Sequence, residues 1–193
     1  ITSRHYAEAV NRDILLCPLF SREGSVHTRL GPDGEGLYSS VDRRLDHPLA
    51  GAFQEIQQRY HVDIVYGRRR MQDPLTGIEQ QPEVVLIDVA SMAAHPLNIF
   101  KADLFNTFGI VSARYEHSWD FEQYVRLAEP GLAVVRALGA TRDGASCVIM
   151  AHEFMGMPTA LAARLHADWG MKTAFYAHEV SPVRKVVEEH AGH

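Results

Sequence analysis

Apolar residues fall along the chain in two recurring patterns, one typical of buried strands and one typical of amphipathic helices. Five short runs are almost wholly apolar and cover residues 14–20, 62–66, 84–89, 146–151 and 173–177. Runs of this length without polar alternation are typical of strands that are buried on both faces. The segments between several of them repeat apolar residues every three or four positions, which indicates helices. Strands that alternate with helices predict an α/β fold.

Helical spacing predicts helices at residues 5–10, 49–60, 98–108, 118–139, 158–170 and 183–190. The apolar face of the third comprises Ile99, Leu104, Phe105 and Phe108. In the fourth, Ser118 is a good N-cap, and Pro130 is expected to kink or break the helix because proline lacks the amide hydrogen.

These elements predict a Rossmann-like or flavodoxin-like domain over residues 1–193, with a mostly parallel sheet and helices on both faces. The runs 146–151 and 173–177 are expected to lie side by side and parallel. Residues 21–48 are rich in Gly and Pro. We expect this segment to be an irregular excursion at one edge of the sheet, with at most one short strand.

Composition narrows the classes of partner. The 193 residues carry a formal net charge of −5, so the strongly basic footprint of a general nucleic-acid binder is absent. No apolar run is long enough for a membrane span or the core of a signal peptide. Cys17 and Cys147 both lie in apolar runs, and we interpret them as core residues of a protein from a reducing, cytoplasmic compartment.

Two of the strand runs end in the same tripeptide, Ala-His-Glu. His152 and Glu153 follow the first run, and His178 and Glu179 follow the next, with the two histidines 26 residues apart. Ligands of open α/β sheets bind at the carboxyl ends of the strands, where the following helix presents its amino end. We therefore predict a binding site at these four residues, with purely structural histidines as the competing interpretation.

Two imidazoles and two carboxylates also suit zinc or iron. The sequence lacks an H-E-x-x-H motif or two histidines four residues apart on a helix, so no metal is expected. The glycine-rich segment at residues 31–36 matches neither phosphate-loop signature and predicts a turn.

Residues 147–164 (CVIMAHEFMGMPTALAAR) and 172–179 (KTAFYAHE) resemble the N-terminal domain of GT-B glycosyltransferases of the glycogen and starch synthase type, the group 1 glycosyltransferase relatives. In that family one strand ends in a His-Ala-His-Asp-Trp type of motif, and the next ends in Thr-x-His-Asn. Here these places are taken by Met150-Ala-His-Glu-Phe154 and by Tyr176-Ala-His-Glu179. Segments 62–67, 84–88 and 119–124 fit the family pattern as well.

This resemblance implies the acceptor-side half of a retaining glycosyltransferase, which moves a sugar from a nucleotide-sugar donor to an acceptor glycan and uses no further cofactor. It implies substrate binding by His152, Glu153, His178 and Glu179, with His152 reaching the donor sugar. The donor-nucleotide site and the catalytic residues belong to a C-terminal domain that lies outside these 193 residues. We therefore assign no catalytic residue here, and we expect a fragment that is inactive by itself.

Departures from the family pattern indicate a divergent member and leave synthesis of a glucan open. Glu153 stands where Asp is usual, Phe154 replaces Trp, Met150 replaces the first His, and Glu179 replaces Asn. Two other hypotheses stay open. One is an independent Rossmann-like or flavodoxin-like module that binds a nucleotide or a phosphorylated metabolite, and the other is a metal-dependent hydrolase that uses the two His-Glu pairs.

Overall fold

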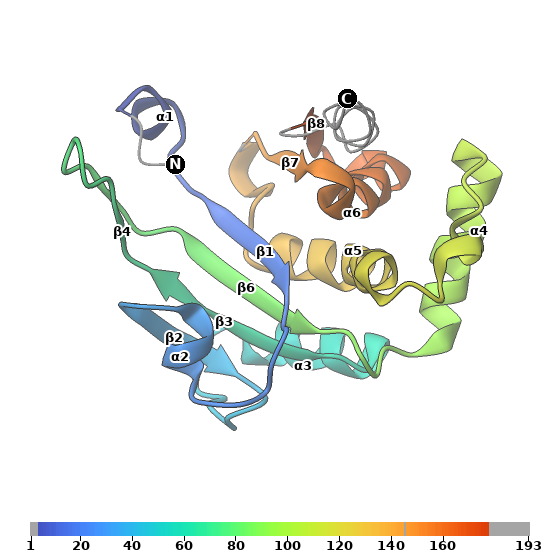
Figure 1. The fold of residues 1–193 in the computed structure, drawn as a ribbon, viewed down its shortest axis with the longest axis horizontal. Helices are drawn as coiled ribbons and strands as arrows, with labels where there is room; N and C mark the ends of the chain where they lie inside the picture. Colours follow the sequence, from blue (N-terminus) through green and yellow to red (C-terminus); the bar gives the residue numbers. More distant parts are fainter. Residues whose placement is uncertain (1–3, 145, 178–193) are drawn as a thin grey trace, which may run out of the picture.

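A computed structural model of the chain describes residues 4–144 and 146–177, and it has a mixed α/β fold (Figure 1). Each of the five predicted apolar runs contains a strand, and within the described residues three further strands lie outside these runs. The strands are β1 (Ile14–Pro18), β2 (Gly34–Ser39), β3 (Asp63–Arg69), β4 (Met71–Gln72), β5 (Glu79–Gln80), β6 (Glu83–Asp88), β7 (Val148–His152) and β8 (Lys172–Tyr176).

The main sheet has four strands in the order β1-β6-β3-β2. Strand β1 pairs with β6 in parallel, whereas β3 runs antiparallel to both β6 and β2. The predicted mostly parallel sheet is therefore replaced by a mixed one. The reason is the connection from β3 to β6, which is the β4–β5 hairpin rather than a crossover helix. A hairpin joins antiparallel neighbours, because a parallel pair needs a crossover of a dozen or more residues.

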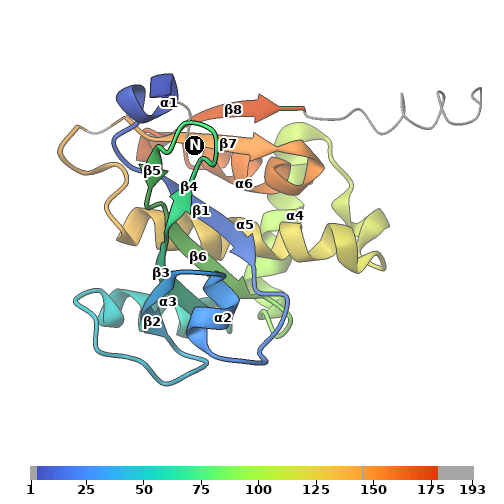
Figure 2. The same cartoon turned by 60° about the vertical axis from the view of Figure 1, so that its left-hand side comes forward.

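A second sheet consists of β7 and β8, which pair in parallel with His152 opposite Tyr176. The prediction that these two runs are adjacent and parallel is confirmed. Figures 1 and 2 both show the strands in the order β8, β7, β1, β6, β3 and β2, although β7 does not pair with β1.

Residues 4–144 and 146–177 contain four longer α-helices, each of more than eight residues, and two short ones. They are α1 (Arg4–Ala9), α2 (Val26–Leu30), α3 (Ala50–Tyr60), α4 (Ala94–Phe108), α5 (Trp119–Ala137) and α6 (Glu153–Leu165). Single 3-10 turns occur at η1 (Ser112–Tyr115), η2 (Arg142–Gly144) and η3 (Ala167–Trp169). Helix α5 contacts β1, β6 and α6, and α6 in turn contacts β7 and β8. The two helices therefore support both sheets from the same side (Figure 1).

The main core lies between this helix layer and the main sheet. Phe53 of α3, Leu132 of α5, and Ile64 and Ile87 of the sheet are fully buried there. The other face of the sheet packs against α2 of the 21–48 segment, where Leu30 is buried. Strand β2 of this segment forms the edge next to β3, so the excursion lies at one edge as predicted.

Three helix predictions need correction. Helix α4 starts earlier than predicted and buries Leu97, Phe100 and Leu104. Of the predicted face only Leu104 is buried, whereas Ile99, Phe105 and Phe108 are exposed, so the helix turns a different side toward the core. Helix α5 continues through Pro130, which is itself buried, so packing of the flanking turns outweighs the lost amide donor. Helix α6 begins at Glu153, ahead of the predicted residue 158. The helix predicted at 183–190 lies outside the described residues.

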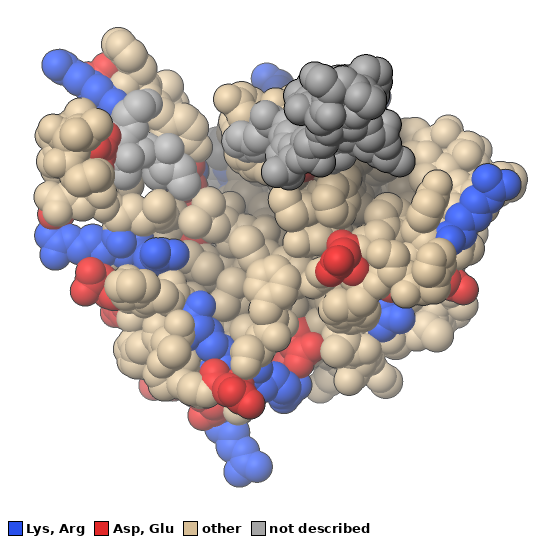
Figure 3. Space-filling model, viewed as in Figure 1, with Lys and Arg blue, Asp and Glu red and all other residues tan. Residues whose placement is uncertain are grey.

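The two cysteines also differ from the expectation of core residues. Cys147 is half-buried, and Cys17 is exposed although it sits in the apolar run of β1. On the face of the molecule drawn in Figure 3, basic and acidic side chains are interspersed. That face therefore carries no extended surface of a single sign.

Candidate functional site

The turn from β7 into α6 combines an exposed histidine with a strained backbone. His152 ends β7 and is also the N-cap residue of α6, with an extended backbone and an exposed side chain. Glu153 follows with a φ of 55°, in the left-handed region. For a residue other than glycine this conformation costs about 1–2 kcal/mol. Such strain persists only where the surrounding structure fixes it, and it clusters at functional sites.

Small residues behind the turn hold it in place. A Cβ added to Gly156 would lie 2.6 Å from the Cα of Ala151, so the first turn of α6 packs directly on the end of β7. Ala151, Ala160, Ala162 and Ala163 are buried. This close approach leaves little freedom to the chain at His152 and Glu153, which explains how the left-handed conformation is maintained.

Aromatic side chains surround the turn. The His152 ring lies 5.8 Å from the Tyr176 ring of β8, and the Phe154 ring meets Tyr124 of α5 edge-on at 5.9 Å. Phe154 and Tyr176 are both more than half exposed. We call His152, Glu153, Phe154, Tyr124 and Tyr176 the β7 site. It offers a ligand exposed ring faces beside an imidazole and a carboxylate.

Charge in the β7 site favours an uncharged ligand over a phosphate. The amino end of a helix attracts anions through its free amide groups. In α6 the carboxylate of Glu153 occupies the first turn, so it already provides negative charge there. Burial raises the pKa of Tyr124, with smaller contributions from Cys17 and Asp120, which keeps its hydroxyl protonated.

The structure describes only two of the four residues of the predicted binding site. His152 and Glu153 lie at the carboxyl end of β7, and the strand that precedes the second pair ends beside it at Tyr176. His178 and Glu179 lie outside the described residues, so their place in the site stays a prediction. Among residues 4–144 and 146–177, no group of three or more His, Cys, Asp and Glu side chains could hold a metal ion.

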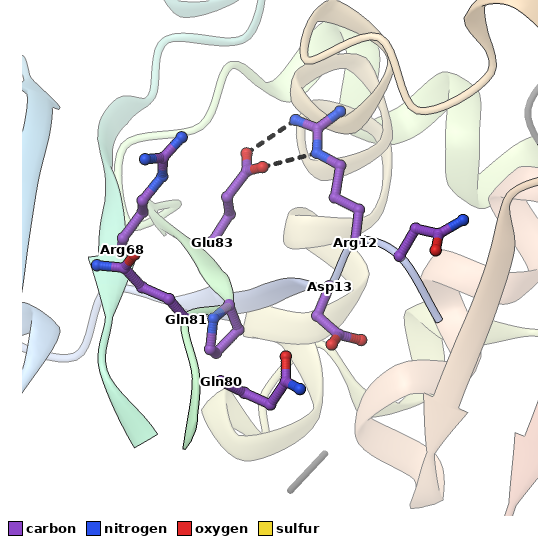
Figure 4. Close-up of a pocket in the computed structure, with 8 residues that line it drawn as sticks. Arg12, Asp13, Arg68, Gln80, Gln81 and Glu83 are labelled. Carbon is purple, nitrogen blue, oxygen red and sulfur yellow. Dashed lines mark hydrogen bonds and ion pairs between the residues drawn. The ribbon is translucent and has the colours of Figure 1, made fainter. Parts of the chain in front are cut away.

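A polar pocket of about 170 Å³ lies at the opposite end of the main sheet, beside the start of β1 and β6 (Figure 4). Arg12 donates to both carboxylate oxygens of Glu83, at 2.6 and 2.8 Å, and to the carbonyl of Leu138 at 2.8 Å. The Tyr66 hydroxyl donates to the same carboxylate at 2.6 Å. Sequence reasoning missed this network, because Arg12 and Glu83 are 71 residues apart and no motif connects them.

The charged groups of this pocket pair with one another. Burial alone would raise the pKa of Glu83, but the hydrogen bonds from Arg12 and Tyr66 outweigh burial and lower it below the usual value. Burial, followed by the hydrogen bond to Glu83, raises the pKa of Tyr66 to about 12. Since Arg12 and Glu83 satisfy each other, we interpret this end of the sheet as a structural clasp between β1 and β6.

A second internal network joins α4 to α5. The carboxylate of Glu122 is buried, and it accepts from Lys101 Nζ at 2.9 Å and from Arg126 Nε at 3.1 Å. Arg126 also donates to the carbonyl of Ala90 at 3.1 Å, after the end of β6. These contacts fix the start of α5, and with it the position of Tyr124 in the β7 site.

None of the helices within residues 4–144 and 146–177 has both the length and the apolar character that a membrane crossing requires.

Comparisons with known proteins assign the chain to no family. The chain matches no protein-family model, no curated protein and no solved structure.

Proposed function

We propose that this chain is the acceptor-side half of a retaining glycosyltransferase of the GT-B type, and that the β7 site contacts the sugar. The observation that carries the proposal is the strained turn that presents His152 and Glu153 beside exposed aromatic rings at the end of β7. The resemblance of residues 147–164 and 172–179 to glycogen and starch synthases supports the same position. It is the end of the sheet at which α/β proteins bind ligands.

The chemistry of the β7 site suits a sugar ring. A neutral imidazole offers one hydrogen-bond donor and one acceptor, and a carboxylate accepts, so His152 and Glu153 match neighbouring hydroxyl groups. The faces of Phe154 and Tyr176 suit the C–H face of a pyranose. In glycosyl transfer the donor sugar develops positive charge, which the Glu153 carboxylate and the electron-rich ring faces favour.

The leaving nucleotide diphosphate requires a different surface. Stabilising it calls for cationic or amide donors positioned at the developing charge, whereas the β7 site consists of an imidazole, a carboxylate and aromatic rings. We therefore place the donor nucleotide on a second domain, as the family resemblance implies, and expect residues 1–193 alone to transfer no sugar. The parallel pairs β1–β6 and β7–β8, which pack against the adjoining helices α5 and α6, support a divergent Rossmann-like half of such a fold.

Saturation-transfer NMR on residues 1–193 tests the binding part of the proposal. The probes are UDP-glucose, ADP-glucose, GDP-mannose, maltotriose and inorganic phosphate. We expect transfer from the protein to the sugar protons of at least one sugar-containing probe, and at least tenfold weaker binding of that probe by His152→Ala. The melting temperature should stay within about 2 °C, because the side chain is exposed.

His95→Ala is the matched control, since His95 is another exposed histidine and lies on α4. It should leave binding unchanged. Absence of any contact with sugar protons, or equal losses in His152→Ala and His95→Ala, would overturn the proposal. Binding of phosphate that competes with all nucleotide probes, without contact to the sugar, would instead support an independent phosphate-binding module.

A further inference from the structure

We propose that the outward side of α4 and the turn after it bind a second copy of this chain, with the two α4 helices packed antiparallel around a two-fold axis. We call this surface the α4 face, and it comprises the exposed residues of α4 together with residues 109–113. The inference does not depend on glycosyl transfer. It rests on the charges, the exposed apolar side chains and the residue spacing of α4.

The first observation concerns charge on the side of α4 that faces water. A helix at the surface of a globular protein normally carries charged residues on that side. Helix α3 does so, because Glu55 and Arg59 are among its exposed residues. The structure describes all of α4, and none of the exposed residues of this helix is Asp, Glu, Lys or Arg. They are Ala94, His95, Asn98, Ile99, Ala102, Phe105, Asn106, Thr107 and Phe108.

Both charged residues of α4, Lys101 and Asp103, are partly buried. Lys101 donates to Glu122 at 2.9 Å and to Glu116 at 3.3 Å, and its side chain is only 11% exposed. After Asp103 the sequence has no charged residue until Arg114. Charged residues are depleted in the buried centre of protein–protein interfaces and remain at the rim. The α4 face therefore has the charge distribution of an interface.

The second observation is the apolar surface that the α4 face exposes. Five of its large apolar side chains are between 36% and 57% exposed, and they are Ile99, Phe105, Phe108, Ile110 and Val111. Ala102 lies between Ile99 and Phe105 on the helix surface, three residues from each. Single exposed apolar side chains are ordinary, whereas a continuous apolar surface marks a site of interaction.

The α4 face lies at an accessible end of the molecule. Helix α4 stands at the right-hand end in Figure 1. It contacts η1, α5 and α6, and it buries Leu97, Phe100 and Leu104. At 3.6 residues per turn, Ile99 and Ala102 point away from these buried side chains. Two copies can therefore bring their α4 faces together while each keeps its own core contacts.

The spacing along α4 specifies the partner. His95, Ile99, Ala102 and Asn106 follow one another at intervals of four, three and four residues, which is the spacing of a seam between two paired helices. If the two-fold axis passes between Ile99 and Ala102, antiparallel packing places Ile99 opposite Ala102 of the second copy. The same packing places His95 opposite Asn106 of the second copy.

This seam is complementary to itself. A large side chain faces a small one, and an imidazole faces an amide to which it can hydrogen-bond. A two-fold interface requires such self-complementarity, because the same surface is used on both copies. A charged residue near the seam would be brought close to its own copy, and the exposed side of α4 carries none of Asp, Glu, Lys or Arg. We therefore assign the α4 face to a second copy and not to a different protein.

The size of the α4 face fits a reversible dimer. Half of the surface of a 15-residue helix, about 22 Å long and about 11 Å across, is roughly 400 Å². Two copies then bury about 800 Å² from the helices alone, and residues 109–113 bring the total toward about 1,200 Å², the lower end for specific interfaces. We expect dissociation in the micromolar range.

Analytical ultracentrifugation of residues 1–193 at about 1 to 500 μM tests the proposal. The variants are Ile99→Lys, Ala102→Glu and the double variant that combines them. Leu75→Lys is the matched control, because Leu75 is 95% exposed and lies on the β4–β5 hairpin, away from α4. The melting temperature of each variant is measured at about 1 μM, where the chain is expected to be monomeric.

We expect the native chain and Leu75→Lys to form dimers with a Kd below about 100 μM. Ile99→Lys and Ala102→Glu should each weaken the dimer at least tenfold. Both should change the melting temperature by less than about 2 °C, since the two side chains are exposed. The double variant should associate at least threefold more tightly than Ile99→Lys, because antiparallel packing places each new ammonium group opposite a new carboxylate. A parallel pair would place like charges opposite each other and would show no recovery.

A native chain that stays monomeric up to about 500 μM overturns the proposal, and so does a dimer that Leu75→Lys weakens as much as Ile99→Lys. Lack of recovery in the double variant overturns the antiparallel seam. Two further results with a monomeric chain would name another occupant and overturn the proposal as well. One is binding to phosphatidylcholine vesicles that Ile99→Lys abolishes. The other is a change in the NMR signals of α4 when residues 178–193 are removed.

Discussion

The left-handed backbone of Glu153 predicts which of two substitutions, to glycine or to alanine, leaves the folded protein more stable. At a φ of 55°, a side chain with a Cβ costs about 1–2 kcal/mol in the folded state, and glycine avoids that cost. Glycine also loses about 0.4–1 kcal/mol more on folding, because its unfolded chain is freer. Glu153→Gly should therefore be more stable than Glu153→Ala by about 1 kcal/mol. Because both variants lack the Glu153 carboxylate, the difference between them does not depend on the interactions of that group.

The assay is urea unfolding together with thermal unfolding of residues 1–193. For a chain of this size 1 kcal/mol corresponds to about 2–4 °C in melting temperature, so the Gly variant should melt about 3 °C higher than the Ala variant. If Glu153 had ordinary helical dihedrals, the order would reverse, because Ala exceeds Gly by about 1 kcal/mol inside a helix. The two possibilities therefore differ by about 2 kcal/mol.

His61 calibrates the measurement. It has a φ of 53° at the end of α3, where the left-handed conformation is a routine helix ending. His61→Gly should exceed His61→Ala in stability by a similar amount. If this pair behaves as expected while Glu153→Ala equals or exceeds Glu153→Gly, then the strained turn is wrong, and the main support for the β7 site is lost with it.

Three further predictions concern the core and the clasp. Glu83→Gln should lower the free energy of unfolding by about 2 kcal/mol, because it leaves Arg12 without its charged partner; a loss below 0.5 kcal/mol in urea titration would contradict the clasp. Since the pKa of Glu83 is lowered in the folded protein, its contribution should be fully present above the unfolded pKa of about 4.3 and should vanish as the pH falls through the folded value. Unfolding titrations from pH 7 to pH 2.5 should show this loss in the native chain and a flatter curve in Glu83→Gln. Gly156→Ala should lower the free energy of unfolding by about 2 kcal/mol through overpacking. Gly51→Ala, with nothing within 4 Å of the new Cβ, should raise it by up to about 1 kcal/mol. Equal effects of the two variants in thermal unfolding would contradict the tight packing of α6 on β7.

The apolar pattern located the elements well because burial in this fold follows period and run length. All five apolar runs became strands, and α3 buries Phe53, Ile56 and Tyr60 as their spacing predicts. The pattern did not locate the exposed face of α4 or the continuous path of α5 through Pro130. Both depend on which neighbour a helix packs against, and local spacing carries no information about that neighbour.

The β7 site was found in part because a polar pair after a buried strand is visible in the sequence. His152 and Glu153 were singled out by their position after an apolar run, and the structure places them at the carboxyl end of β7. The left-handed backbone of Glu153 had no signal, because apolar periodicity reports burial and not φ. Tyr124 and Phe154 meet from two different helices, and only their packing brings the rings together.

The sequence by itself determined where strands and helices form and which strand ends carry polar chemistry, since these depend on local burial patterns and on residue type. The tertiary structure alone decided the direction of β3, because an apolar run reads the same for a parallel and an antiparallel strand. It alone paired Arg12 with Glu83 across 71 residues, because a long-range ion pair leaves no local signature. The tertiary structure also decided that Cys17 of β1 is exposed. An apolar strand is fully buried only with neighbours on both sides, and within the described residues β1 pairs with a strand on one side only.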